Sequence, residues 1–334
     1  MLELKGKKIL LFVPKFFGYE LDIKKELENL GAKVFYFDAR PKNDFITKVF
    51  IRLNLKKMIQ KKIDKYYQNI IMNTKDESFD YLFLVDPETI DNKKIENIKK
   101  QHNNIKVYTY MWDSVNNRKK SLKILPLSDR FFTFDKMDKK INDKIEFLPL
   151  FYINDYKDIA EDRSDISYDF SFIGTIHSDR YKVIKKFEQF AEKNNMKTFF
   201  YFYSPSKILF FFQKLLKKDF RNIDKKDISY VSLNKKDVVD IVRKSKSIID
   251  IHHPRQSGLT MRTLEILGAK RKLFTTNDDV ENYDFYDANN IYCFDRNNPN
   301  IKIEFLNKDN TEIDDSIYKK YSLTQWIKHI FKEE

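Results

Sequence analysis

Short apolar runs alternate with amphipathic stretches along most of this chain. Continuous apolar runs at 8–14 and 81–85 are typical of strands that are buried on both faces of a sheet. Between them, residues 20–30 carry apolar positions at helical spacing, and Gly31 is placed to end that helix. Buried strands that alternate with helices predict a parallel sheet covered by helices.

The same alternation continues to residue 150. Further strands are expected at 34–37, 107–112, 131–134 and 147–150, and further helices at 44–72 and 92–100.

The second half repeats this logic after a polar segment, 154–167, that we interpret as a linker. Strands are expected at 169–173, 198–203, 228–231, 248–251, 273–276 and 291–294, and helices at 179–194, 207–217, 236–244, 259–267 and 323–331. The chain is therefore predicted to be an α/β protein with two doubly wound, Rossmann-like domains, 1–153 and 168–334, whose sheets face a central cleft. The last helix, 323–331, is expected to pack back on the first domain.

Charge and cysteine content narrow the class of protein. The 334 residues carry a net charge of +13, which suits an anionic substrate, an anionic membrane or nucleic acid. The single cysteine, Cys293, excludes an internal disulfide. No apolar run approaches the length of about 20 residues that spans a bilayer, and the N-terminal run is short for a signal segment, so we expect a cytoplasmic protein.

Residues 247–277 form the most informative segment. A strand, a loop with Gly258, a short helix and a second strand follow one another, and such a loop presents backbone N–H groups and a helix dipole to phosphate. Arg262 and Glu265 lie three apart and share a helix face. Arg262 suits a diphosphate and Glu265 suits ribose hydroxyls; an ion pair between the two is the alternative.

The sequence GLTMRTLEILGAKRKLFTTN at 258–277 resembles the donor-site segment of GT-B glycosyltransferases, especially the CgeB-like and family-4-like branch. The resemblance implies a GT-B fold of two Rossmann-like domains, with a nucleotide sugar bound mainly by the second. It also implies that Glu265 binds ribose and Arg262 the diphosphate. Many family-4-like enzymes carry another Glu eight positions earlier, where this chain has Ser257.

Other residues of the second half are candidates for the donor site. The candidates are Arg255, Ser257, Gly258, Leu259 and Thr260 before the helix, Gly174 and Thr175 after the strand at 169–173, and Tyr203 at the end of the next strand. The alternative at 174–175 and at Tyr203 is an ordinary turn.

The first half offers a candidate base. Asp113 follows the strand at 107–112, where a carboxylate can deprotonate an acceptor hydroxyl, or can instead cap the next turn. Asp86 ends the neighbouring strand. No cluster of metal ligands and no D-x-D at a strand end is visible, so we expect a metal-independent reaction without a cofactor. We expect the donor to be a UDP-sugar.

Two basic, apolar segments, 45–67 and 207–218, have the composition of helices that lie on an anionic membrane. The alternative is that each is a surface helix with its apolar side in the core.

We therefore expect a glycosyltransferase that moves a sugar from a nucleoside-diphosphate sugar to a glycan or lipid-linked glycan acceptor in bacterial surface polysaccharide synthesis. A two-domain protein that only binds a small ligand is the alternative. A nucleic-acid-binding protein is a weaker one, because the basic residues are dispersed and no nucleic-acid motif is present; no specific nucleic acid is expected as a partner.

Overall fold

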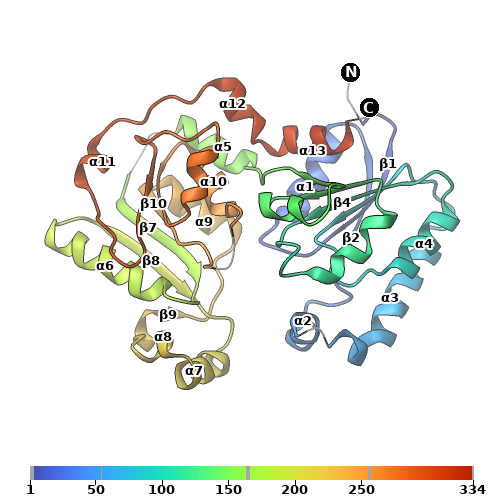
Figure 1. Cartoon of the computed structure of the whole chain (residues 1–334), viewed down its shortest axis with the longest axis horizontal. Helices are drawn as coiled ribbons and strands as arrows, with labels where there is room; N and C mark the ends of the chain where they lie inside the picture. Colours follow the sequence, from blue (N-terminus) through green and yellow to red (C-terminus); the bar gives the residue numbers. More distant parts are fainter. Residues whose placement is uncertain (1–3, 54, 163–165, 255–256, 333–334) are drawn as a thin grey trace. The chain divides into compact units, whose positions relative to one another are not determined.

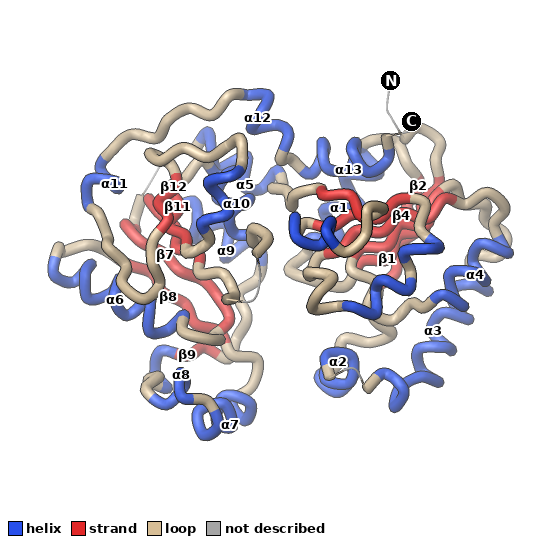
Figure 2. The backbone as a smooth tube through the Cα atoms, in the orientation of Figure 1, coloured by secondary structure: helices blue, strands red, loops and turns tan. Residues whose placement is uncertain are grey.

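A computed structural model describes residues 4–53, 55–162, 166–254 and 257–332. The chain divides into two compact units. Unit 1 comprises Met1–Pro149 together with Leu323–Glu334, and unit 2 comprises Leu150–Ser322. Figure 1 and Figure 2 show that each unit is a twisted sheet with helices packed around it.

Unit 1 contains a parallel six-stranded sheet with the strand order β2-β1-β3-β4-β5-β6. Its strands are β1 (Lys8–Val13), β2 (Lys33–Asp38), β3 (Tyr81–Val85), β4 (Lys106–Met111), β5 (Arg130–Thr133) and β6 (Ile145–Phe147). Its α-helices are α1 (Tyr19–Asn29), α2 (Phe45–Arg52), α3 (Gln60–Asn73), α4 (Asn92–Gln101) and α13 (Leu323–Phe331), and its 3₁₀ helices are η1 (Lys56–Ile59), η2 (Lys119–Lys123), η3 (Leu125–Leu127) and η4 (Lys136–Lys140).

Unit 2 contains a second parallel six-stranded sheet with the strand order β12-β11-β10-β7-β8-β9. Its strands are β7 (Tyr168–Thr175), β8 (Thr198–Tyr203), β9 (Ile228–Ser229), β10 (Ser245–Asp250), β11 (Lys272–Thr275) and β12 (Ile291–Cys293). Its α-helices are α5 (Asn154–Glu161), α6 (Arg180–Lys193), α7 (Lys207–Leu216), α8 (Lys218–Arg221), α9 (Lys235–Arg243), α10 (Met261–Ala269), α11 (Ile303–Asn307) and α12 (Asp315–Lys320), with 3₁₀ helices η5 (Lys225–Asp227) and η6 (Asp278–Asn282).

The two sheets confirm the predicted pair of doubly wound, Rossmann-like domains. The central strands β1 and β3 are almost fully buried, because helices cover both faces of a sheet of this kind. This burial is the reason that continuous apolar runs identified them.

The long helix expected at 44–72 is wrong as a single element. The structure has α2, then η1, then α3. Asp44 begins α2 by accepting a hydrogen bond from the backbone N–H of Thr47 (2.8 Å). Helix α3 buries Ile63, Tyr67 and Ile70, whereas Met58 in η1 is exposed, so the apolar face of α3 does not extend back through the segment.

The segment 154–167, expected as a linker, also differs. Residues 154–161 form α5, which buries Tyr156 and Ile159 and packs against α10 within unit 2. The chain passes from unit 1 to unit 2 at Pro149–Leu150, ahead of this helix. The high polarity of the segment reflects the exposed face of α5.

The C-terminal helix α13 belongs to unit 1. The ring of Trp326 packs edge-on against Tyr110, with centroids 4.7 Å apart, and Phe331 packs against Tyr81 at 5.0 Å. Arg130 of β5 donates hydrogen bonds to the carbonyls of His329 (2.9 Å) and Ile330 (3.0 Å), the end of the helix. Helix α13 therefore completes one side of the first sheet.

Helix α10 runs two residues further than expected, so that Gly268 lies inside the helix. Lys270, with a φ of 48°, adopts the left-handed conformation that ends it. A Cβ on Gly268 would lie 2.7 Å from Cβ and Cγ of Tyr152. Tyr152 stacks on Tyr318, whose hydroxyl donates to the carbonyl of Gly268 (2.6 Å). The glycine is required by this close approach and does not form a turn.

Gly268→Ala tests this close approach. Alanine normally stabilises a helix by about 1 kcal/mol relative to glycine. Here the added methyl group meets the buried Tyr152 ring, and we expect the free energy of unfolding to fall by about 1–3 kcal/mol. Urea denaturation measures the difference, with Lys236→Ala at an exposed position of α9 as the control, expected within about 0.5 kcal/mol of the parent. A stabilised Gly268→Ala variant would contradict the packing described.

Candidate functional site

The loops that follow the strands of the second sheet carry most of the predicted site residues. Strands β7, β8, β10, β11 and β12 run parallel, so their carboxyl ends lie along one edge of the sheet. Ligands of open parallel sheets bind beyond this edge. The loop from β10 to α10 is the predicted donor segment.

Asp250, the last residue of β10, fixes the start of α10. Its buried carboxylate accepts hydrogen bonds from the hydroxyls of Thr260 (2.6 Å) and Thr263 (3.1 Å). Thr260 is also the N-cap of the helix, since its hydroxyl accepts from the backbone N–H of Thr263 (3.4 Å). The first turn of α10 is thus attached to the sheet edge.

Asn277 holds the loop before that helix. It follows β11, is buried, and donates from its side-chain amide to the carbonyls of Ser257 (3.2 Å) and Gly258 (3.3 Å). The side chain of Leu259 is buried, so this residue presents only its backbone to a ligand. The loop at 257–259 is therefore held by a side chain from the neighbouring strand.

Arg262 and Glu265 form an ion pair on α10, with 2.6 Å between Nη1 and Oε2. Both side chains are largely buried. The alternative of an internal pair is thus present in the structure, and it places both groups one turn into the helix. The pairing holds each side chain in one position, where it remains a candidate for a bound nucleotide.

Gly174 makes room for an arginine from α6. A Cβ at this position would lie 2.8 Å from the Phe172 ring and 3.2 Å from Nη1 of Arg180. The Arg180 guanidinium donates to the carbonyls of Thr175 (3.2 Å) and Ile251 (2.8 Å), and so joins the loops after β7 and β10. Gly174 and Thr175 contribute backbone and space, while the charge comes from Arg180.

Three arginines meet at this edge. Arg296, after β12, donates to the carbonyl of His252 (2.8 Å) and lies 3.6 Å from the carboxylate of Asp179. Burial and the nearby charges of Arg262 and Arg296 lower the pKa of Arg180 to about 10, although Asp250 opposes this effect. The three guanidinium groups therefore share this edge with the carboxylates of Asp179, Asp250 and Glu265.

Two histidines of this edge, His177 and His252, have lowered pKa values. Burial, together with Arg180 and His253, lowers the pKa of His177 to about 3. Burial and Arg296 lower the pKa of His252, whose ring nitrogen Nδ1 lies 2.8 Å from the hydroxyl of Thr276. His252 is half-buried and its neighbour His253 is exposed. Neutral imidazoles at His177 and His252 leave the positive charge of the site to its arginines.

Two further residues, Tyr203 and Arg255, were predicted for the donor site. Tyr203 ends β8 beside Thr175, its partner in the parallel ladder, and is half-buried at the same edge. Arg255 lies outside the described residues.

The predicted base Asp113, in unit 1, follows β4 at the carboxyl edge of the first sheet. Its two carboxylate oxygens accept a hydrogen bond from the amide of Asn117 (3.0 Å) and pair with Nε of Arg118 (3.3 Å). The two contacts occupy both oxygens of the carboxylate. Asp113 is therefore held in a charge network at the expected sheet edge.

Asp86, at the end of β3, is the more unusual carboxylate. It is buried, it has a left-handed backbone (φ 43°), and its Oδ1 has no hydrogen-bond partner among the described residues. Its Oδ2 lies 3.3 Å from Arg118. Burial raises its pKa to about 6; Glu88 and Asp113 act in the same direction, against Arg118 and Arg40. A strained, buried and incompletely bonded acid is characteristic of functional sites.

Asp38 and Arg40 do not simply pair with each other. The carboxylate of Asp38 accepts from the backbone N–H of Arg40 (2.9 Å), whereas the Arg40 guanidinium forms two bonds to Glu88, one of 2.8 Å. The Glu88 backbone carbonyl also accepts from Lys56. Glu88 therefore connects the loops after β2 and β3.

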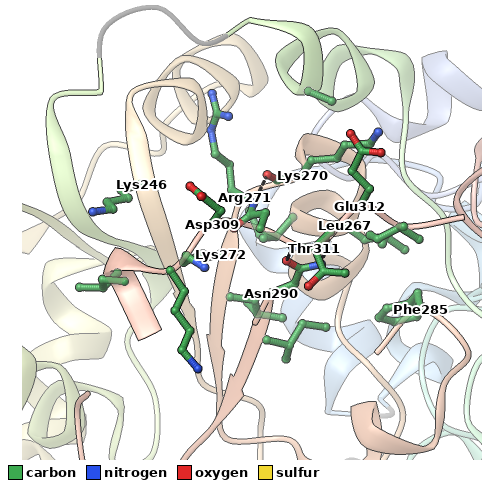
Figure 3. A pocket seen from close by; sticks show the side chains of 18 of the residues that line it. Lys246, Leu267, Lys270, Arg271, Lys272, Phe285, Asn290, Asp309, Thr311 and Glu312 are labelled. Atoms are coloured by element: carbon green, nitrogen blue, oxygen red, sulfur yellow. Dashed lines mark hydrogen bonds between the residues drawn. The ribbon is translucent and has the colours of Figure 1, made fainter. Parts of the chain in front are cut away.

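A cavity of about 460 Å³ lies at the opposite, amino edge of the second sheet (Figure 3). Its lining includes Lys246, Lys272 and Ile291, which lie near the starts of β10, β11 and β12. The buried Lys272 donates to the carbonyl of Asn289 (2.6 Å). The cavity is thus distinct from the arginine cluster. Within the part of the chain described, no three His, Cys, Asp or Glu side chains are grouped to hold a metal ion.

Sequence reasoning missed several residues of this site. They are Asp250, Thr263, Asn277 and Arg296, and the importance of Arg180. Asp250 ends a strand, Asn277 and Arg296 lie in loops, and Arg180 and Thr263 lie in the first turn of a helix. The available signal was position alone, since each lies near the end of a predicted strand or the start of a predicted helix.

Comparison with solved structures finds the same architecture. A glycosyltransferase from Rickettsia africae ESF-5 superposes with a TM-score of 0.57 and 14% identity, covering 98% of this chain and 99% of that one. HepE of Anabaena, in complex with UDP-glucose, gives 0.53 and 10%, with 97% and 95% covered. A UDP-N-acetylglucosamine 2-epimerase gives 0.52 and 12%, with 98% and 94% covered.

No family model and no curated protein matches the sequence. The structural likenesses nevertheless cover nearly the whole chain and establish its fold as GT-B, with two Rossmann-like domains. At these identities they concern the fold alone, and this fold is shared by transferases and an epimerase.

The raised pKa of Asp86 predicts a pH effect on stability. The folded protein binds more protons than the unfolded chain between about pH 4 and pH 6, so its free energy of unfolding falls as the pH rises through this window. The asparagine side chain is neutral at every pH, so Asp86→Asn removes this fall in the free energy of unfolding. We expect the variant to match the parent at pH 4 and to exceed it by about 2–3 kcal/mol at pH 7. Denaturant titrations across this range provide the test, and parallel curves for the two proteins would show that Asp86 ionises normally.

Proposed function

We propose that this protein is a glycosyltransferase that moves a sugar from a nucleoside-diphosphate sugar to a hydroxyl of a glycan acceptor. The observation that carries the proposal is the group of Arg180, Arg262 and Arg296 at the carboxyl edge of the second sheet. It occurs beside a helix N-terminus in a GT-B fold.

The charge of this site suits a diphosphate. Guanidinium groups bind phosphate oxygens through paired, charge-assisted hydrogen bonds, and α10 adds the N–H groups of its first turn. The pKa of Arg180 is lowered first by burial and then by the charges of Arg262 and Arg296, a repulsion that an anionic ligand relieves. As the glycosidic bond breaks, negative charge grows on the leaving diphosphate, and fixed arginines stabilise that charge without requiring a metal ion.

The remaining donor contacts follow from the positions of the predicted residues. Arg262 holds the carboxylate of Glu265 in place, and a carboxylate held in this way is a preorganised acceptor for ribose hydroxyls. The backbone at 257–260 approaches the diphosphate, Gly174 and Thr175 line the edge beside it, and Tyr203 contacts the base or ribose. A UDP-sugar is the proposed donor, supported by the fold shared with HepE, whose structure contains UDP-glucose.

Unit 1 supplies the acceptor side in this proposal. Asp86 is better suited than Asp113 to take the proton of the attacking hydroxyl, because its pKa is near 6 and its Oδ1 has no described partner. The acceptor oxygen bonds to the anomeric carbon, its proton passes to the carboxylate, and the nucleoside diphosphate leaves with the bonding electrons. Asp113 and Glu88 hold Arg118, which contacts Asp86, and so act as positioning residues.

We further propose that the acceptor is a lipid-linked glycan of bacterial surface polysaccharide synthesis, used at the cytoplasmic face of the membrane. The support is a basic chain with an apolar, lysine-rich helix on unit 2.

Thermal unfolding with UDP, GDP, CDP, ADP and dTDP, first without metal and then with Mg²⁺, tests the donor site. We expect one nucleotide to raise the melting temperature without metal, since binding to the folded state stabilises it. Arg262→Ala and Glu265→Ala should each weaken that nucleotide by about 10–100-fold, the loss of a charged hydrogen bond. Arg221→Ala, at an exposed position of α8, removes the same charge from unit 2 and should leave affinity unchanged.

If a nucleotide raises the melting temperature of the parent and of both site variants equally, Arg262 and Glu265 do not bind it, and their assignment to the donor site is wrong. The absence of any shift at millimolar nucleotide would favour the alternative of a protein that binds a different small ligand.

Asp86→Asn and Asp113→Asn separate the two carboxylates. With UDP-glucose, UDP-galactose and UDP-N-acetylglucosamine as probes, UDP release is measured with water and then with bacterial lipid extract as the acceptor. We expect Asp86→Asn to lower kcat by about 10²–10⁴-fold, the usual effect of losing a general base, while nucleotide affinity is retained. Asp113→Asn should have a smaller effect. The reverse order would return the role of base to Asp113.

A further inference from the structure

Helix α7 exposes an apolar surface on unit 2. Figure 1 draws it with α8 next to β9, the edge strand of the second sheet. Phe210 is the one residue of α7 that is fully buried, where it packs near Phe220 of α8. The helix is thus attached to the core by a narrow contact on one side.

The other side of α7 forms a continuous apolar stripe. Its members are 53–80% exposed and are spaced as i, i+3, i+4, i+7 and i+8: Ile208, Phe211, Phe212, Leu215 and Leu216. This spacing places them on one face of a helix. In a globular domain such a face turns toward the core, whereas here it turns toward solvent. A contiguous exposed patch of this kind indicates an interaction surface.

Lysines border the stripe. Residues 207–218 contain Lys207, Lys214, Lys217 and Lys218 and no acidic residue. The ammonium group of Lys207 lies over the ring of Tyr230 (5.7 Å to the centroid) and that of Lys217 over the ring of Phe220 (5.4 Å). Lys214 donates to the carbonyl of Ile223 (2.6 Å). The surface therefore combines large apolar side chains with lysines along the side where the helix meets unit 2.

The segment 45–67 does not share this arrangement. Its helix α3 turns Ile63 and Tyr67 into the core of unit 1, and Lys62 lies 3.6 Å from Asp44. Its exposed apolar residues among those described are spread over α2, η1 and the turn between them: Ile46, Leu53, Leu55 and Met58. Of the two segments predicted to lie on a membrane, only α7 presents a single apolar face with a basic border.

We propose that α7 binds an anionic membrane, with its apolar stripe in the boundary between headgroups and acyl chains and its lysines on lipid phosphates. Amphipathic helices with bulky apolar residues and a basic border bind such surfaces by burying apolar area and by electrostatic attraction to anionic lipids. Pairing of two copies of the segment 207–218 would bring eight lysines together, and like charges oppose that contact. Among the described residues, no helix is long and apolar enough to cross a bilayer, so the attachment is to one leaflet.

This inference does not depend on sugar transfer. It would place unit 2 at a lipid surface whether or not the arginine cluster binds a nucleotide.

Co-sedimentation of the full chain with vesicles tests the proposal. We expect binding to equal mixtures of phosphatidylglycerol and phosphatidylcholine at 100 mM NaCl, at least tenfold stronger than to phosphatidylcholine alone. Phe211→Ser combined with Phe212→Ser should weaken binding at least tenfold and leave any nucleotide-induced thermal shift unchanged, which also shows that the variant is folded. Ile46→Ser combined with Met58→Ser removes two exposed apolar side chains from unit 1 and should have no effect. In a Phe211→Trp variant, tryptophan fluorescence should move to the blue and be quenched by lipids brominated in the acyl chain.

Three results would overturn the proposal. The first is no binding to anionic vesicles at low salt. The second is binding that depends on charge alone, equal for the parent and the serine variant and without lipid quenching. The third is a dimer in light scattering that the serine variant abolishes, which would assign the stripe to a second copy of the chain.

Discussion

The buried carboxylate of Asp250 is the constraint on which the second sheet's functional edge depends. By accepting from Thr260 and Thr263 it ties the first turn of α10 to the end of β10. That attachment determines where Arg262 and Glu265 project, because both lie within the next turn of the helix. Asp250 also opposes the repulsion that lowers the pKa of Arg180. One side chain thus fixes both the geometry and part of the charge balance of the edge.

The two units organise charge in opposite ways. The edge of the second sheet gathers arginines around neutral histidines, an environment for an anion. The edge of the first sheet surrounds Arg40 and Arg118 with the carboxylates of Asp86, Glu88 and Asp113. Burial raises the pKa of Asp86, and the neighbouring charges of Glu88 and Asp113 act in the same direction. The same sheet architecture therefore carries arginines at the functional-site edge of one unit and a group of carboxylates at that of the other.

Much of the fold was readable from the sequence because parallel strands are buried on both faces. Runs such as 8–14 and 81–85 are continuously apolar, so they can be recognised as strands without knowing which strands pair with them. The proximity of Arg262 and Glu265 could also be predicted, since two residues three apart in one helix lie on the same face. The extension of α10 past residue 267 was missed because Gly268 is required by Tyr152, more than a hundred residues earlier. Arg296 and Asn277 were missed for a related reason: parallel strands bring separate loops to one edge, and a single polar residue in a loop carries no sign of its neighbours.

Helix α13 is the last element of unit 1 to be synthesised. It follows all of unit 2 in the chain, yet Trp326 and Phe331 cover Tyr81, Phe83 and Tyr110 in the first sheet. During synthesis on the ribosome, the strands of unit 1 emerge first but keep this aromatic surface uncovered until α13 has been made. Unit 2 can therefore close its core before unit 1 does, although it is translated later. The nascent chain must protect a large apolar surface throughout that interval, which is the period when association with other chains or with a chaperone competes with folding.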